Sequence, residues 1–257
     1  QAVDRFKIMI GTAGTWTISQ DTDAPDGFGN SLKYSCTTAT ASPAYVILEH
    51  RMEGQMLQQL AKGTASAKKV TLSFYVKCSK TGNFQVNLRD KDNSRIIGNV
   101  VTISSANTWE KKTITFDGDT TGTLNNDNGE SLTLEMFFDA GSSFNTGAVP
   151  TSWETEAATD RAAGVTLALA DSTSNYINIT GVQLEAGSSA TEFEHRPYGT
   201  ELALCQRYLP AFVSSSTNST LPGIATALGT NVNFIFNHPV PARVKGTGVT
   251  VSGATHF

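Results

Sequence analysis

Histidines are the side chains most often used for both catalysis and metal binding, and this sequence has few of them. His50, His195, His238 and His256 lie far apart and form no metal-binding motif such as His-Glu-x-x-His. No nucleophile stands beside a base in a known pattern, and no pair of carboxylates is arranged for acid and base catalysis. We therefore predict a protein that is not an enzyme, with structural or surface roles for its histidines.

Two short acidic stretches place oxygen ligands close together, as calcium-binding loops do. They are Asp90-Lys91-Asp92-Asn93 and Asp117-Gly118-Asp119. Neither has the full Asp-x-Asp-x-Asp-Gly spacing followed by a distal Glu, which favours ordinary turns. The sequence predicts no metal and no other cofactor.

The three cysteines, Cys36, Cys78 and Cys205, are an odd number and widely separated. This spacing argues against a disulfide framework and against a zinc site. We expect three reduced thiols, as in a protein made in a reducing cytoplasm. The chain begins at Gln1 without a methionine, which is compatible with a processed piece of a longer polypeptide.

Composition limits the classes of partner. A chain of 257 residues with 39% hydrophobic content can form one sizeable core, or one core and a small second one. The formal net charge is −4 and the 19 Lys and Arg are scattered, whereas nucleic-acid binding needs clustered positive charge. No run approaches the roughly 18 to 20 apolar residues of a membrane span. We predict neither nucleic-acid binding nor membrane insertion.

Alternation of apolar and polar residues is the dominant pattern, and Gly, Asn, Asp and Ser clusters interrupt it at short intervals. In residues 70–77 the even positions are apolar, and the odd positions are mainly polar. Similar strands are predicted at 6–10, 15–19, 32–36, 45–52, 84–89, 114–116, 132–138 and 176–185. In the last of these the apolar positions change parity, which predicts a bulge at Gly181. Such a series predicts an all-β, jelly-roll β-sandwich.

Helices and domain boundaries are less strongly marked. Short helices are predicted at 55–62 and 201–209 from their apolar spacing. We expect a sandwich domain at 1–198, a connector helix at 199–209, and at 210–257 the beginning of a second small β domain or a docking tail. In the third region, strands are expected near 231–236 and 243–252.

Four stretches resemble a known family. They read GTASAKKVTLSFYVK at 63–77, NTWEKKTIT at 107–115, ITGVQLEAG at 179–187, and ATEFEHRPYG at 190–199 followed by ELALCQRY at 201–208. This series resembles a recurring domain of tail-fibre and related virion proteins of tailed bacteriophages, over most of residues 4–209. In that family the domain is similar to the jelly-roll carbohydrate-binding modules of bacterial glycoside hydrolases. Many such modules hold a structural calcium with an Asp of the closing strand, where this sequence has Asn178.

If the resemblance extends to sugar binding, an aromatic ring and planar polar groups must face the ligand from the side of the sheets that points away from the core. The outward positions that meet this description are Tyr75, Gln85, Asn87, Arg89 and Glu135. Trp153 is a further candidate, because the polar loop 150–161 has no apolar pattern to bury it. Trp109 opens a strand and is predicted to lie in the core, while Trp16 stays undecided.

The resemblance implies a virion component that contributes to attachment to a host-surface glycan. Residues 196–199 (Arg-Pro-Tyr-Gly) lead into the predicted helix, whose apolar side needs a partner. We expect contacts with other virion proteins and a homo-oligomer, a trimer about a threefold axis. Two alternatives stay open: a purely architectural virion protein (spacer, collar or head decoration), and the accessory module of a polysaccharide hydrolase.

Overall fold

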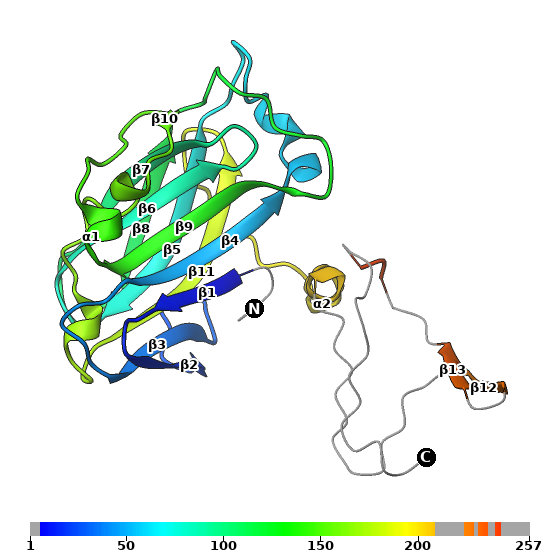
Figure 1. The fold of residues 1–257 in the computed structure, drawn as a ribbon, viewed down its shortest axis with the longest axis horizontal. Helices are drawn as coiled ribbons and strands as arrows, with labels where there is room; N and C mark the ends of the chain where they lie inside the picture. Colours follow the sequence, from blue (N-terminus) through cyan, green and yellow to red (C-terminus); the bar gives the residue numbers. More distant parts are fainter. Residues whose placement is uncertain (1–5, 209–223, 229–230, 236–239, 243–257) are drawn as a thin grey trace. The chain divides into compact units, whose positions relative to one another are not determined.

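The computed structural model describes residues 6–208, 224–228, 231–235 and 240–242 (Figure 1). The chain divides into two compact units, Gln1–Glu194 and His195–Phe257. The sequence-based boundary, after residue 198, lies four residues further along. Within the described residues, no helix is long and apolar enough to cross a membrane.

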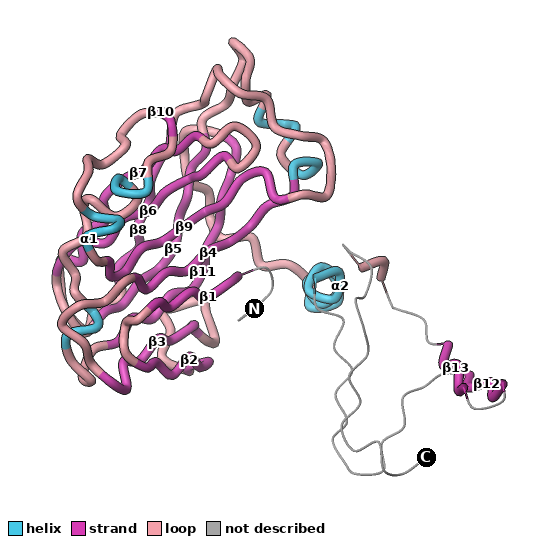
Figure 2. The backbone as a smooth tube through the Cα atoms, in the orientation of Figure 1, coloured by secondary structure: helices cyan, strands magenta, loops and turns pink. Residues whose placement is uncertain are grey.

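The first unit consists of two antiparallel sheets stacked as a jelly-roll sandwich, as the alternation predicted (Figure 2). The six-stranded sheet, here called the front sheet, has the order β1 (Phe6–Gly11), β4 (Tyr45–Glu53), β9 (Glu130–Ala140), β6 (Gly82–Asp90), β7 (Arg95–Ile103) and β10 (Glu154–Thr155). The five-stranded back sheet has the order β2 (Thr15–Asp21), β3 (Ser31–Thr38), β11 (Tyr176–Ala186), β5 (Val70–Cys78) and β8 (Glu110–Phe116).

The core lies between the two sheets and is centred on aromatic rings from both. Phe138 packs edge-on against Tyr34 and Phe84, with both pairs of ring centroids 5.6 Å apart. Phe74 meets Phe84 at 6.1 Å. Since all four side chains have no exposed surface, each contributes on the order of 1.5 to 3 kcal/mol of hydrophobic stabilisation. The inward positions predicted by alternation in β5 are confirmed.

The predicted bulge in β11 is also confirmed. The register of β11 with β5 shifts between Thr180 and Gln183, and Gly181 has φ +61°. A Cβ atom at this position would lie 2.6 Å from the ring of Phe28, so only glycine fits without displacing that ring. After the shift, Val182 and Leu184 pack against the core.

Short helical turns lie in the connections. The helix predicted at 55–62 is two 3-10 turns instead, η1 (Gly54–Met56) and η2 (Gln58–Leu60), with Ala61 in the left-handed region at the end. Between β9 and β11 lie α1 (Ser142–Asn145), η3 (Ala158–Asp160) and η4 (Leu169–Asp171). Residues 141–165, here called the cover segment, include α1, β10 and η3. β10 extends the front sheet at its edge, where it pairs with β7, and α1 and η3 lie over the outer side of the sheet (Figure 1).

In the second unit, the predicted connector helix is present as α2 (Tyr198–Tyr208). β12 (Ile224–Leu228) pairs antiparallel with β13 (Asn231–Ile235), the strand expected near 231–236. The strand expected at 243–252 lies outside the described residues, as do His238 and His256.

Candidate functional site

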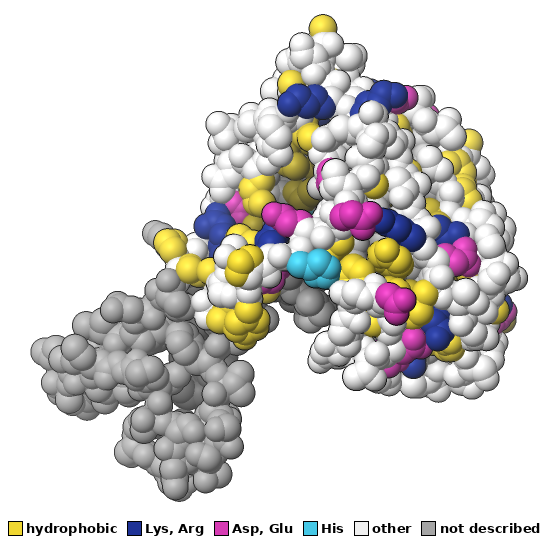
Figure 3. All heavy atoms as spheres, turned by 180° about the vertical axis from the view of Figure 1, so that it is seen from behind, with side chains coloured by type: hydrophobic (Ala, Val, Ile, Leu, Met, Phe, Trp, Pro, Cys, Tyr) yellow, Lys and Arg dark blue, Asp and Glu magenta, His cyan; other side chains and the backbone are white. Residues whose placement is uncertain are grey.

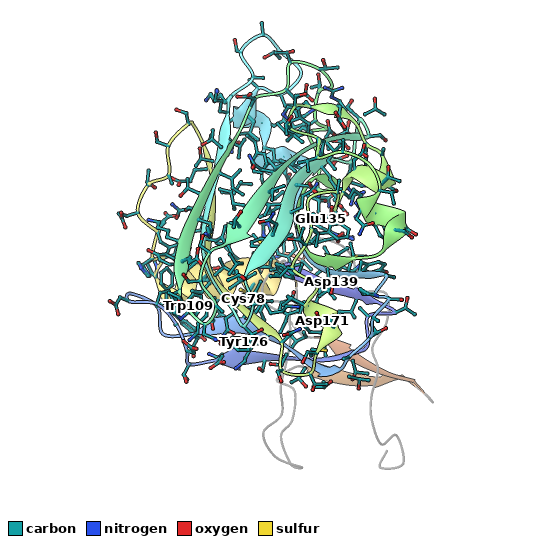
Figure 4. All side chains as sticks on the ribbon, turned by 90° about the vertical axis from the view of Figure 1, so that its left-hand side faces the viewer. Cys78, Trp109, Glu135, Asp139, Asp171 and Tyr176 are labelled. Carbon is teal, nitrogen blue, oxygen red and sulfur yellow. The ribbon has the colours of Figure 1, made fainter. Side chains whose placement is uncertain are left out.

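Four of the six predicted sugar-binding residues meet on the outer face of the front sheet. Gln85, Asn87 and Arg89 alternate along β6, and Glu135 of β9 is paired with Asn87 in the register of the two strands. However, Gln85, Asn87 and Glu135 have no exposed surface, and Arg89 is 7% exposed. Figure 4 shows Glu135 on the side of the sandwich that carries the cover segment.

Arg161 of the cover segment binds the Glu135 carboxylate with both ends of its guanidinium group. Nε donates to Oε2 at 3.2 Å, and Nη2 contacts Oε1. The Asn87 amide donates to Glu135 Oε2 at 3.1 Å and to the Arg161 carbonyl at 2.7 Å. The polar groups of the front sheet therefore hold a segment of the same chain.

Gln85 contacts the backbone of the cover segment in the same manner. Its Nε2 donates to Asn87 Oδ1 and to the Asp160 carbonyl, both at 2.8 Å. Its Oε1 accepts the Gly164 N–H at 2.9 Å. Because a buried amide without partners costs free energy, these bonds fix the position of the cover segment.

Arg89 completes the charged part of this network. Its guanidinium contacts Glu135 Oε1 at 3.2 Å and also pairs with Glu156 of the cover segment. Burial alone would raise the pKa of Glu156, but the hydrogen bond and charge of Arg89 outweigh it and hold that pKa below its ordinary value. While the cover segment is docked, these four predicted residues cannot contact a sugar.

The cover segment also has a small apolar core of its own against the front sheet. Phe144 lies 5.4 Å from Phe137, ring to ring, and Ala162 and Ile47 belong to the same buried cluster. The Arg161 guanidinium lies over both rings, 5.2 Å from Phe137 and 5.3 Å from Phe144. Apolar packing and the ion network thus hold the segment together.

Trp153, which the sequence analysis expected to be exposed, is half-buried. Its ring packs against the main core, its Nε1 donates to the Asp117 carbonyl at 2.7 Å, and Lys62 Nζ lies 5.0 Å from the ring centre. The partners come from distant parts of the chain, so the polar sequence around Trp153 did not reveal them.

Trp109, predicted to lie in the core, is instead beside the outward-facing Lys77 of the back sheet. Trp109 Nε1 donates to Asp23 Oδ1 at 2.9 Å, and Lys77 Nζ contacts Asp23 Oδ2 at 2.6 Å. The hydrogen bonds from Lys77 and Trp109 lower the pKa of Asp23. The alternation in the sequence could have predicted this position. Ile114 and Phe116 point inward, so the odd-numbered positions, including Trp109, point outward.

Tyr176 is a second aromatic residue of this outer face that the sequence analysis did not select. Its hydroxyl donates to Asn107 Oδ1 at 2.6 Å, and Lys33 Nζ lies 5.0 Å from its ring centre. Lys33 also pairs with Asp21 at 2.7 Å, and the pKa of Asp21 is lowered to about 2 chiefly by that hydrogen bond. Ile177 is buried, so parity again places Tyr176 outward.

Tyr75, the sixth predicted residue, lies on the back sheet, away from the other five. Its half-buried ring is 5.4 Å from Phe28, and Lys111 Nζ is 5.8 Å from the ring centre. Figure 3 shows the molecule from behind, where hydrophobic, acidic and basic side chains are exposed side by side. We refer to Tyr75, Trp109, Tyr176, Lys33 and Lys77 together as the back-face set.

Asn178, which the sequence analysis compared with a calcium-ligating Asp, is fully buried. Its amide donates to Ser31 Oγ at 3.0 Å and lies 3.4 Å from Asp21 Oδ2. The ammonium group of Lys33 supplies positive charge to the same carboxylate. Among the described residues, no group of three or more His, Cys, Asp or Glu side chains is arranged to hold a metal ion.

Among the comparisons with known proteins, only the one with solved structures finds matches, and these show a similar fold. No family model matches the sequence, and no curated protein matches it. The enzymatically active domain of tailspike protein 4 of bacteriophage CBA120 is 12% identical, with a TM-score of 0.40 over 71% of this chain and 19% of that chain. The C-terminal family 22 carbohydrate-binding module of Clostridium thermocellum Xyn10B is 10% identical, with a TM-score of 0.39 over 74% of this chain and 91% of that one. A family 11 module from the same organism is 12% identical, with a TM-score of 0.38 over 75% and 93%. The chain thus spans about a fifth of the tailspike chain.

Proposed function

We propose that this chain is a non-catalytic, glycan-binding component of a tailed-phage virion, within a tail fibre or a similar appendage. The observation that carries the glycan-binding part is the back-face set, which displays aromatic rings beside charged side chains on a rigid sheet. The phage part is supported by the sequence resemblance over most of residues 4–209.

The chemistry of the back-face set suits a sugar. An aromatic ring offers its apolar face to the C–H groups of a pyranose, while charged and polar groups at its edge bind hydroxyls. Trp109 and Tyr176 are held at their polar atoms by Asp23 and Asn107, so the rings keep a defined orientation. Little side-chain entropy is then lost when a ligand binds.

The proposal assigns different roles to the two groups of predicted residues. Gln85, Asn87, Arg89 and Glu135 hold the cover segment, and Trp153 packs against the core. Of the predicted sugar-binding residues, only Tyr75 is available on the surface of the back sheet. We therefore place the glycan on the back sheet.

A glycan array probed with the full chain tests the proposal. Binding to at least one class of bacterial surface glycan is expected, with a loss of about tenfold or more in Trp109→Ala and Tyr176→Ala, because each removes a stacking surface. Tyr198→Ala is the control, since Tyr198 lies in α2 and is 80% exposed. Binding that survives all back-face substitutions would reject this face as the site.

A purely architectural role in the virion is the second candidate. Each polar or aromatic side chain of the back-face set other than Tyr75 already has a hydrogen-bond or ion-pair partner in the same chain; these are Lys33, Lys77, Trp109 and Tyr176. Such contacts can serve to stabilise the sheet, which favours the architectural role. If the chain binds none of the host glycans on the array, this role is favoured. A catalytic domain encoded next to this chain would instead favour the accessory module of a polysaccharide hydrolase.

The same proposal includes a homotrimer within the virion, in contact with other virion proteins. Leu202 of α2 is 40% exposed, which leaves apolar surface on this helix in the single chain. Several copies on one particle would convert weak binding at one site into strong attachment. Mass photometry that finds only monomers of the intact parent protein would overturn the trimer.

A further inference from the structure

Lys62 places its ammonium group among four oxygen atoms inside the first unit. Nζ contacts the Asp90 carboxylate, Asp119 Oδ2 at 3.0 Å, and the carbonyls of Thr121 at 3.0 Å and Gly122 at 2.9 Å. Lys62 is 8% exposed, Asp119 is 4% exposed, and Asp90 has no exposed surface. An amine and a carboxyl group are thus held in contact away from water.

Remote parts of the chain build this arrangement. Lys62 follows the turn that ends at Ala61, Asp90 ends β6, and Asp119 follows β8. The Trp153 ring covers Nζ from the cover segment, with its centre 5.0 Å away. Because these segments are fixed by the sandwich, the two reacting groups stay oriented toward each other.

Hydrogen-bond donors surround the Asp90 carboxyl group in the pattern that acyl transfer requires. Oδ1 accepts the backbone N–H groups of Asp92 and Asn93, both at 3.0 Å. Oδ2, which faces Lys62, also accepts from Asn93 Nδ2 at 2.9 Å. Two backbone donors on one oxygen stabilise an oxyanion, and the amide of Asn93 is placed to assist a leaving oxygen.

The charges of the cluster remain balanced if one ion pair disappears. Arg95 binds Asp119 with two hydrogen bonds, Nε to Oδ2 at 2.7 Å and Nη2 to Oδ1 at 3.1 Å. These two residues form a complete pair without Lys62. Because burying an ion pair carries a desolvation cost, converting Lys62 and Asp90 into a neutral group removes that cost.

We propose that Lys62 and Asp90 condense into an intramolecular amide. Proton transfer across their contact gives a neutral amine and a neutral acid, Nζ then attacks Cγ, and the oxyanion forms on Oδ1. Asp119 accepts a proton from the new C–N nitrogen and passes it to Oδ2. The Cγ–Oδ2 bond breaks, and this oxygen leaves as water. No oxidant, reductant or cofactor takes part.

The product would be a covalent link between the β4–β5 connection and the end of β6. The two residues are 28 positions apart in the sequence, so the amide closes a loop in the unfolded chain. The remaining amide N–H keeps one of the carbonyls at 121 and 122 as its acceptor.

Mass spectrometry of the intact full chain tests whether the amide between Lys62 and Asp90 forms. The expected mass is lower than that of the sequence by one water molecule, trypsin does not cleave after Lys62, and the Lys62 and Asp90 peptides are recovered joined. Lys62→Arg and Asp90→Ala each restore the uncross-linked mass. Peptide mapping assigns the lost water to the joined Lys62 and Asp90 peptides.

Two further variants give a matched comparison. Asp119→Asn is expected to fold and to keep the full mass, or to react much more slowly. Lys69→Arg is the control, because Lys69 pairs with Asp117 at 2.7 Å with side chains 55% and 69% exposed, so water is not excluded there. A wild-type chain of full mass with normal cleavage after Lys62, in fresh and in aged samples, would show an ion pair only and overturn the proposal.

Discussion

The outer faces of the two sheets begin from the same pattern and reach opposite states. On the front sheet, Gln85, Asn87 and Glu135 have no exposed surface, because the cover segment lies over them and forms hydrogen bonds with each. On the back sheet, the aromatic and charged side chains keep part of their surface in solvent. Alternation therefore identifies which side chains leave the core, and coverage by another segment decides which of them can meet a ligand.

Trp153 and Trp109, which both lie in loops, also show that tertiary contacts decide whether a side chain is covered. Trp153 belongs to a polar stretch and packs against the core, whereas Trp109 stands next to an apolar alternation and lies on the outer face. Local composition suggested the reverse for both.

The largest effect should come from breaking the front-face network. Glu135→Ala leaves Arg161, Arg89 and Asn87 without their common acceptor, so the free energy of unfolding should fall by about 3 to 5 kcal/mol. Urea denaturation measures the change, and hydrogen exchange should show faster exchange at the Gly164 N–H. Glu154→Ala, at an exposed position of β10, is the control. A loss below about 1 kcal/mol would mean that the network does not hold the cover segment.

A second test exchanges the roles of the two tryptophans. Trp153→Ala should lower the free energy of unfolding by about 2 kcal/mol, because it removes a half-buried ring that packs against the core, together with a hydrogen bond. Trp109→Ala should cost less than about 1 kcal/mol, since this side chain is outside the core. Thermal denaturation of both variants gives the comparison, and equal losses would contradict the assignment of the two faces.

The smallest expected effect concerns pH. The pKa of Glu156 is lowered in the folded chain, so the unfolded chain binds this proton more readily. The contribution of Glu156 to stability is therefore complete above its ordinary pKa of 4.5 and is lost as pH falls through the lower folded value. Glu156→Gln should show a weaker loss of Tm between neutral and acidic pH than the wild type, with Glu154→Gln as the control. Parallel curves would show that the pair with Arg89 contributes nothing.

Part of the fold and of the candidate site could be predicted from the sequence. The inward positions of β5 and the bulge at Gly181 follow from local periodicity, which any chain with that alternation must obey in a sheet. Parity would also have placed Trp109 and Tyr176 outward, although residue type drew attention to Trp153 instead. The helix predicted at 55–62 is replaced by two short turns at 54–60, which bury Leu57 and Leu60 and end where Ala61 adopts a left-handed conformation.

The sequence by itself determined an all-β sandwich and the sides of β5, β6 and β9 that meet the core, because both depend on spacing between neighbours in the chain. Only the tertiary structure decided that Arg161 reaches Glu135, that Trp153 covers Lys62, and that Lys62 meets Asp90. Those contacts join residues that are far apart in the sequence, and no local pattern records which segment folds over which face.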